Sequence, residues 1–132
     1  MIDILQVIAN KLAADLLLET GVNIFCYELP DALNATIVVQ EPKHIGEVFQ
    51  QIDAETHFIE ITARSKGNVA AKELATKCYN CMCNDTGILE QDGVTFSVEL
   101  QGTPIWKKSD QQDRKYFYFT MKVITMRLNK EA

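Results

Sequence analysis

The chain has 132 residues, a length that fits a single domain spanning 1–132. Hydrophobic residues make up 47% and charged residues 23%, so the composition predicts a folded core and excludes intrinsic disorder. The 13 basic and 18 acidic residues leave a net charge of −5, which argues against nucleic-acid binding through clustered cations.

Membrane insertion and export are also disfavoured by the sequence. The longest aliphatic run, Leu16–Leu18, is too short to cross a bilayer. The segment Met1–Asp3 lacks the basic flank of a signal peptide. We therefore expect no membrane contact, an intracellular chain, and cysteines that are thiols.

The first third of the chain predicts a helix followed by two strands. The helix occupies the first twenty residues, with an apolar face made of Leu5, Ile8, Ala9, Leu12, Ala13, Leu16 and Leu17. Asp3 with Gln6 resembles a capping box at its start, and Gly21 is a candidate carboxy-terminal cap. β-branched and aromatic residues then predict strands over Val22–Leu29 and Ala35–Gln40.

In the middle of the chain the pattern for secondary structure is weak at first and becomes clear from His57 onwards. Pro42–Glu55 predicts a helical turn or a loop. His57–Arg64 alternates in polarity and predicts a half-buried strand, with Ile59, Ile61 and Ala63 facing the core and Glu60, Thr62 and Arg64 facing away. Asn68 is a candidate cap for a second helix, whose apolar face is Ala71, Leu74, Ala75, Cys78 and Met82.

The last third is β-prone. Strands over Ile88–Gln91 and Val94–Leu100 flank Asp92-Gly93, a dipeptide typical of tight hairpins. A polar loop, Gln101–Asp113, then precedes a long strand over Arg114–Arg127. This element order predicts an α+β fold: an antiparallel or mixed β-sheet with two α-helices packed on it and a long late β-hairpin.

Candidate catalytic and metal-binding residues form no complete set. Cys78, Cys81 and Cys83 form a single cluster, whereas a zinc site needs paired ligand motifs. They are interpreted as packing residues, with a thiol-dependent metal or redox site as the alternative. His44 and His57 have no nucleophile motif near them and are interpreted as polar surface residues. We therefore expect no enzyme activity, no metal and no cofactor.

The final strand is long for so small a protein. Fourteen extended residues, Arg114–Arg127, span roughly 46 Å at about 3.3 Å per residue. A compact chain of this length is only about 36 Å across. Both faces of the strand carry apolar side chains, so there are two alternatives. Either a partner subunit covers one face, with a projecting strand edge as a template for pairing, or the helices cover one face and a local loop covers the other. Trp106 is correspondingly either an interface anchor or a core residue.

The arrangement resembles the tail-terminator, or minor capsid, proteins of long-tailed bacteriophages and prophages. The resemblance covers nearly the full length. It rests on the leading helix, the strand ending Ala35–Val39, the block His57–Ser65 entering a helix, the late hairpin, and a final stretch of short matches. These last matches are Thr103-Pro104-Ile105-Trp106, Asp110, Asp113-Arg114 and the aromatic strand Tyr116–Phe119.

The resemblance implies a structural virion protein. Such a subunit forms a homohexameric ring on the end of the tail tube, stops tube polymerisation and forms the head-tail joining interface. Its implied partners are further copies of itself, the tail-tube protein and a head completion or stopper protein, and DNA passes through the ring without specific binding. Its implied location is the virion tail at the head-tail junction, after assembly in the bacterial host cytoplasm. The implied ring or tube contacts are Trp106, Lys107, Lys108, Asp110, Asp113, Arg114, Tyr116 and Tyr118.

Two features depart from the family pattern. The stretch His44–Asp53 looks like an added segment, and the cluster of Cys78, Cys81 and Cys83 matches no family role. A small metal-binding or redox protein that uses these thiols is the alternative function. A protein-binding module that uses the same late strand without closing a ring is a third hypothesis.

Overall fold

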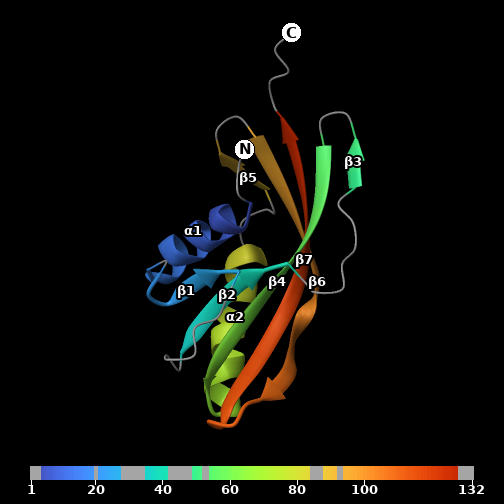
Figure 1. Ribbon diagram of the computed structural model, residues 1–132. Helices are drawn as coiled ribbons and strands as arrows, with labels where there is room; N and C mark the ends of the chain where they lie inside the picture. The colour runs from blue at the N-terminus through green and yellow to red at the C-terminus, as the bar shows by residue number, and fades with distance from the viewer. Residues whose placement is uncertain are drawn as a thin grey trace.

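Two helices and seven strands make up the described part of the chain in the computed structural model, which is an α+β fold (Figure 1). The elements are α1 (Ile4–Leu16), β1 (Ile24–Cys26), β2 (Thr36–Gln40), β3 (Phe49–Gln51), β4 (Ala54–Lys66), α2 (Asn68–Cys83), β5 (Ile88–Gln91), β6 (Val94–Ser109) and β7 (Arg114–Arg127). The structure describes residues 4–19, 21–27, 35–41, 49–51, 54–83, 88–91 and 94–127.

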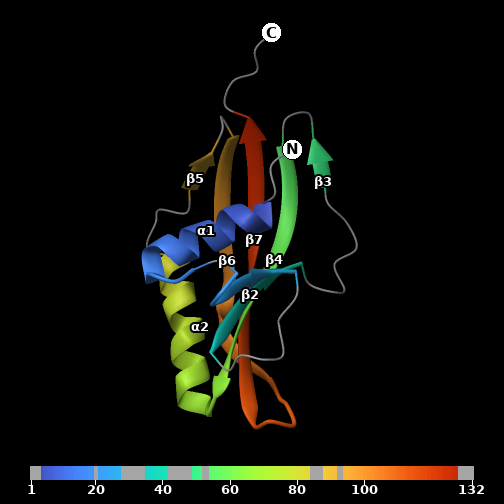
Figure 2. The same cartoon turned by 60° about the vertical axis from the view of Figure 1, so that its left-hand side comes forward.

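The strands form one mixed sheet in the order β1-β2-β4-β7-β6-β5, with β3 paired to β4 beside this path. β1 runs parallel to β2, and the other described pairs are antiparallel. Both helices cover the same face of the sheet, as the two views in Figures 1 and 2 show. The predicted fold class, including the two helices and the late hairpin, is confirmed.

The helix boundaries differ slightly from the prediction. α1 ends at Leu16 because Leu17 adopts a left-handed conformation (φ 57°) and the Leu18 N–H donates to the carbonyl oxygen of Ala13 at 2.9 Å. Gly21 (φ 85°) lies in the following turn, so its prediction as the helix cap is wrong. The predicted cap Asp3 lies outside the described residues. At the start of α2, the Gly67 carbonyl accepts the Ala71 N–H, so Gly67 rather than Asn68 holds the cap position.

The early strands differ from the prediction in two ways: β1 is shorter than predicted, and β3 is a further short strand that was not predicted. β1 stops at Cys26 because Tyr27 turns away with φ 76°. Within Pro42–Glu55, the short strand β3 pairs with the start of β4, so the prediction of a helical turn or loop is wrong there. Residues 42–48, including His44, lie outside the described part of the chain.

The late hairpin is longer than predicted, because β6 continues to Ser109. The predicted Gln101–Asp113 loop is therefore wrong except for its last residues, 110–113. The strand continues because β7 offers backbone partners throughout, for example Tyr118 opposite Ile105. Its register shifts between Gln101 and Ile105 and again between Trp106 and Lys108, which absorbs the irregular stretch around Gly102 (φ 96°).

β7 has the predicted bounds but lies inside the sheet. It pairs with β4 from Lys66↔Arg114 to Ala54↔Met126 and with β6 along the other side. The prediction of a projecting edge on this strand is therefore wrong: both of its edges are occupied. Figures 1 and 2 show β4, β7 and β6 running together along the long axis of an elongated molecule.

The main core lies between the helices and the covered face of the sheet. Alternate residues of β7 point into it, and α1 and α2 close it from the other side. Its most fully buried side chains include Ile8, Leu12, Ile24, Ile59, Ile61, Cys78, Met121 and Val123. A smaller cluster beneath α2 joins Ala63, Ala71, Ala75 and Phe117. Among the described residues, no helix is long and apolar enough to cross a membrane.

Leu12 and Leu17 provide a matched test of this core. Leu12 lies within α1 and is fully buried, whereas Leu17 directly follows the helix and is 90% exposed. We expect Leu12→Ala to lower the free energy of unfolding by about 3 kcal/mol, because it leaves a cavity. Leu17→Ala should change it by less than about 0.5 kcal/mol. Urea denaturation measures both, and equal losses would contradict the described packing.

Candidate functional site

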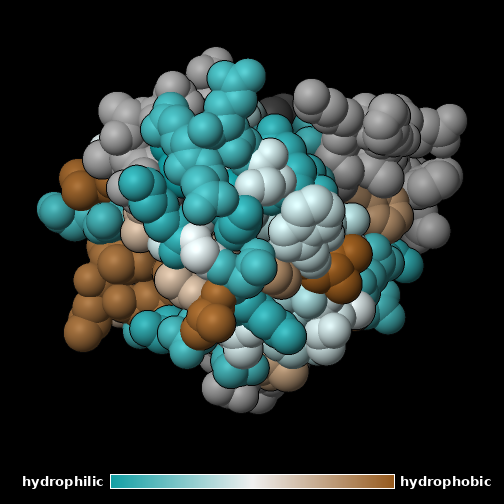
Figure 3. Space-filling view, turned by 90° about the horizontal axis from the view of Figure 1, so that it is seen from below, coloured by the Kyte–Doolittle hydropathy of each residue, from teal (hydrophilic) through white to brown (hydrophobic). Residues whose placement is uncertain are grey.

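The predicted contact residues gather at the end of the hairpin that contains the β6–β7 turn. Trp106, Lys107 and Lys108 lie on β6, Asp110 and Asp113 lie in the turn, and Arg114, Tyr116 and Tyr118 lie on β7. From the turn end, the molecule shows a largely hydrophilic surface interrupted by separate hydrophobic patches (Figure 3). The structure thus brings all eight residues into one region of the fold.

The turn is a three-residue hairpin loop. The Asp110 N–H donates to the Arg114 carbonyl, and the Asp113 N–H donates to the Asp110 carbonyl, each at 3.0 Å. Asp113 adopts φ 61°, the left-handed position that such loops need before the second strand begins. Aspartate tolerates this conformation better than most residues, so the sequence permits the tight reversal.

The Asp110 carboxylate holds this turn together. One oxygen accepts the N–H groups of Gln112 (2.9 Å) and Arg114 (3.0 Å), and the other accepts the Arg114 Nε (2.9 Å) and the Tyr116 hydroxyl (3.0 Å). Partial burial raises the pKa of Asp110, but hydrogen bonds from the Arg114 backbone, Tyr116, the Gln112 backbone and the Arg114 side chain outweigh it and lower the pKa to about 2. The carboxylate is therefore a structural anion and not an acid-base group for neutral pH.

Beyond the turn, cations pack on the two tyrosines of β7, on the sheet face away from the helices. Tyr116 lies between Arg64 on β4 and Lys108 on β6, with the Arg64 Cζ 5.8 Å and the Lys108 Nζ 4.8 Å from its ring centroid. Tyr118 lies under Lys107, whose Nζ is 5.3 Å from that ring centroid. These contacts link β4, β7 and β6 to one another across the sheet and stabilise their pairing.

Lys107 also forms the ion pair that links β6 to β4. Its Nζ lies 2.6 Å from Glu60 Oε2, and the Thr62 hydroxyl donates to the same oxygen at 3.0 Å. Glu60, Thr62 and Arg64 are all buried, so the predicted solvent-facing side of this strand is wrong. The sequence analysis missed these three residues as part of the site. The sequence did contain one signal for their burial, the aromatic pair Tyr116 and Tyr118. Aromatic side chains on this face of the sheet need neighbouring side chains that pack against them.

Ile105 and Trp106 remain exposed, at 53% and 55% of their surfaces. Trp106 is therefore not a core residue. Both lie on the outer edge of β6, where β5 pairs only as far as Ser97, so no described strand covers the edge beyond it. The free edge is poorly suited to pairing with another strand, because its register is irregular and Pro104 lacks an N–H.

The thiols do not form a site among the described residues. Cys78 is fully buried, and burial with the nearby Cys81 raises its pKa to about 12. The Cys81 Sγ contacts Asp15 Oδ2 of α1 at 3.2 Å, and Cys83 is exposed. The described part of the chain contains no group of three potential metal ligands. This geometry favours the packing interpretation of Cys78.

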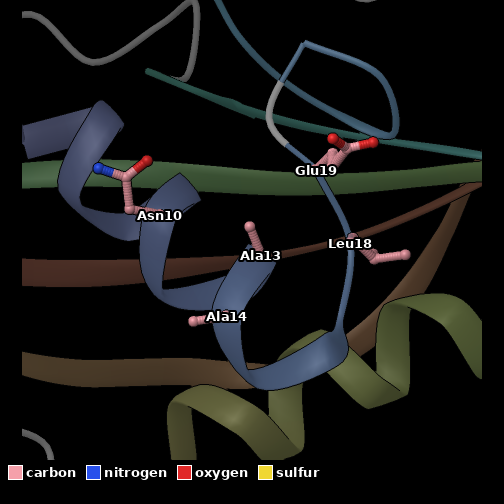
Figure 4. A pocket seen from close by; sticks show the side chains of 5 residues that line it. All are labelled: Asn10, Ala13, Ala14, Leu18 and Glu19. Atoms are coloured by element: carbon pink, nitrogen blue, oxygen red, sulfur yellow. The ribbon is translucent and has the colours of Figure 1, made fainter.

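A hollow of about 390 Å³ lies at the carboxy-terminal half of α1, lined by Asn10, Ala13, Ala14, Leu18 and Glu19 (Figure 4). Among the described residues that line it, Glu19 alone is titratable, so they include no nucleophile and no acid-base pair. Comparison with known proteins finds no family model that matches the chain and no curated protein that matches it.

The low pKa of Asp110 predicts a defined pH dependence. Because its pKa is about 2 in the folded protein and about 3.9 in an unfolded chain, its contribution to stability is complete above about pH 4 and is lost as the pH falls towards 2. The wild-type protein should therefore exceed Asp110→Asn in stability by a constant amount from pH 5 to 7, and the difference should shrink between about pH 4 and 2. Urea midpoints across this range measure it.

Asp113→Asn is the matched control, since the Asp113 side chain is 84% exposed and pairs only with Lys115 among the described contacts. This substitution changes the other carboxylate of the same turn and leaves the hydrogen bonds of the Asp110 carboxylate in place. A stability difference for Asp110→Asn that vanishes near pH 6 would contradict the role given to this carboxylate.

Thiol reactivity should separate Cys78 from Cys83. In the native protein at pH 8 we expect a maleimide to modify Cys83 at least about 100-fold faster than Cys78, whose thiol is buried and holds its proton. Mass spectrometry of timed digests measures both rates, with urea-unfolded protein as the control. Rapid labelling of both residues, or stoichiometric zinc in the purified protein, would instead support the thiol-dependent alternative.

Proposed function

We propose that this chain is a structural assembly subunit of a long-tailed bacteriophage or prophage. In this proposal it caps the tail tube as a homohexameric ring, stops tube polymerisation and provides the head-tail joining interface. Its place is the virion, at the junction of tail and head. The observation that carries the proposal is the exposure of Trp106, which leaves 55% of its surface in water on the outer edge of β6.

The energetic argument starts from Trp106. A tryptophan that is more than half exposed leaves apolar area in water that a partner subunit would cover. It is fixed on a strand that pairs with β7, and the bonds of Asp110 close the adjacent turn. A tryptophan side chain has only two rotatable bonds, so its ordering on binding costs little conformational entropy, which is typical of interface anchors.

The charges support a protein partner more than a nucleic-acid partner. Lys107 is paired with Glu60 and Arg114 with Asp110, so two of the cations in this region are already neutralised. Six copies of a chain with charge −5 would carry about −30, and such a ring would let DNA slide past without binding it. The proposed protein partners are further copies, the tail-tube protein and a head completion or stopper protein.

Trp106→Ala tests the proposal directly. We expect it to weaken capping of tail tubes by about 30-fold or more, the loss that corresponds to at least about 2 kcal/mol at an interface anchor. Because the side chain is largely exposed, the free energy of unfolding should change by less than about 1 kcal/mol. Negative-stain electron microscopy of the purified protein mixed with its tail-tube protein measures capped ends over a concentration series.

Leu17→Ala serves as the control, because Leu17 is 90% exposed directly after α1, a helix that lies away from the β6–β7 turn (Figures 1 and 2). It should leave both capping and stability unchanged. A wild-type protein that never caps tubes at any concentration would refute the proposal. Wild-type binding to a partner without ring formation would favour the protein-binding module instead.

A further inference from the structure

The sheet face away from the helices is basic near the β6–β7 turn. Among the described residues, the cations there are Arg64, Lys66, Lys107, Lys108 and Arg114, and the carboxylates are Glu60 and Asp110. Asp113 and Lys115 of the turn pair with each other and add no net charge. This region therefore carries +3, and because the whole chain carries −5, the rest of it carries −8.

The strand register places these cations on one face. Arg64 of β4 lies opposite Tyr116 of β7, and Lys66 lies opposite Arg114, so these side chains project from the same side of the two strands. Lys108 of β6 also lies opposite Tyr116, with its Nζ 4.8 Å from the ring centroid. The cations of three neighbouring strands therefore form one continuous surface.

Two of the cations are available to another molecule. Lys66 and Lys108 have exposed side chains, and neither forms an ion pair with any described residue. The other three are buried or already paired. The buried guanidinium of Arg64 still contributes to the positive potential around the two lysines, because a charge acts on its neighbours beyond contact distance.

An exposed apolar side chain adjoins the two lysines. Ile105 lies opposite Tyr118 and is 53% exposed, so it belongs to the same face as Lys108. Trp106 lies opposite Phe117 and points to the helix side of the sheet, so it belongs to a different surface. A DNA backbone matches this combination poorly, because two available cations release few counterions and phosphates do not cover an apolar side chain.

We propose that this basic face (Arg64, Lys66, Ile105, Lys107, Lys108 and Arg114) binds an acidic segment of a different protein. Carboxylates of that segment pair with the two exposed lysines, and an apolar side chain of the segment covers Ile105. Such binding does not require a ring, so this inference goes beyond the proposed function.

A second copy of the chain is a poorer match for the basic face. Among the described residues outside this region, the exposed carboxylates without an ion pair lie apart from one another. They are Glu19 after α1, Glu41 after β2, Glu73 on α2 and Glu99 on β6. No two of them belong to the same element, so the described part of the chain does not present a compact acidic patch.

Two matched double variants test the inference. Lys66→Glu with Lys108→Glu reverses the available cations of the basic face. Lys72→Glu with Lys77→Glu reverses two exposed cations of α2, on the other side of the sheet, and makes the net charge equally more negative. Fluorescence anisotropy measures binding of a labelled peptide of Glu-Leu-Glu repeats, with a labelled DNA duplex as the second probe.

We expect the wild type to bind the peptide more tightly than the DNA. The basic-face variant should bind the peptide at least about 10-fold more weakly, and the α2 variant should stay within about 2-fold of the wild type. Urea denaturation checks that both variants fold. If the basic-face variant does not fold, Lys66→Glu alone, compared with Lys72→Glu, should still weaken peptide binding.

Three results would overturn the inference. Equal losses in the two double variants would show an effect of net charge alone, and tighter binding of DNA would make the partner a nucleic acid. Wild-type self-association that the basic-face variant abolishes, measured by sedimentation velocity, would make the occupant a second copy. Tube capping by a wild-type protein that does not bind the acidic peptide would leave the proposed function standing and remove this surface.

Discussion

The pairing of β7 with β4 on one side and β6 on the other is the constraint on which the rest of the structure depends. It holds three long strands side by side along the length of the molecule. The helices come before and between these strands in the chain and cover only one of their faces. The opposite face must therefore be stabilised by the strands' own side chains, and the outer edge of β6 is left open.

That opposite face is stabilised by charge and aromatic contacts in place of a second helical layer. Lys107 and Glu60 come from strands separated by β7, and they meet across the ring of Tyr118. Arg64 and Lys108 are both cations, and each packs on the Tyr116 ring from the strand on its own side of β7. Removing Lys107 or Glu60 would leave the other charge of that ion pair poorly solvated, so the ion pair and the ring contacts together stabilise the hairpin end.

The spacing of apolar residues in the sequence correctly predicted those elements that pack one face against the apolar core. The bounds of β7 and the buried face of α2 were correct because alternate or helically spaced residues enter the core. The continuation of β6 was missed because an edge strand near a turn needs few apolar residues, and Gly102 and Pro104 imitate a loop. Burial of Glu60 was missed because its cation, Lys107, lies 47 residues away in the sequence.

The open edge of β6 combines two properties that have different physical consequences. Its irregular register and its proline hinder another strand from extending the sheet, which protects the chain from edge-to-edge aggregation. Its exposed Ile105 and Trp106 have the opposite effect, since they increase the gain from covering this surface. An edge that resists strand addition but exposes an indole favours a partner that binds through side chains. Such selectivity is what a subunit needs if it must assemble a finite number of copies and then stop.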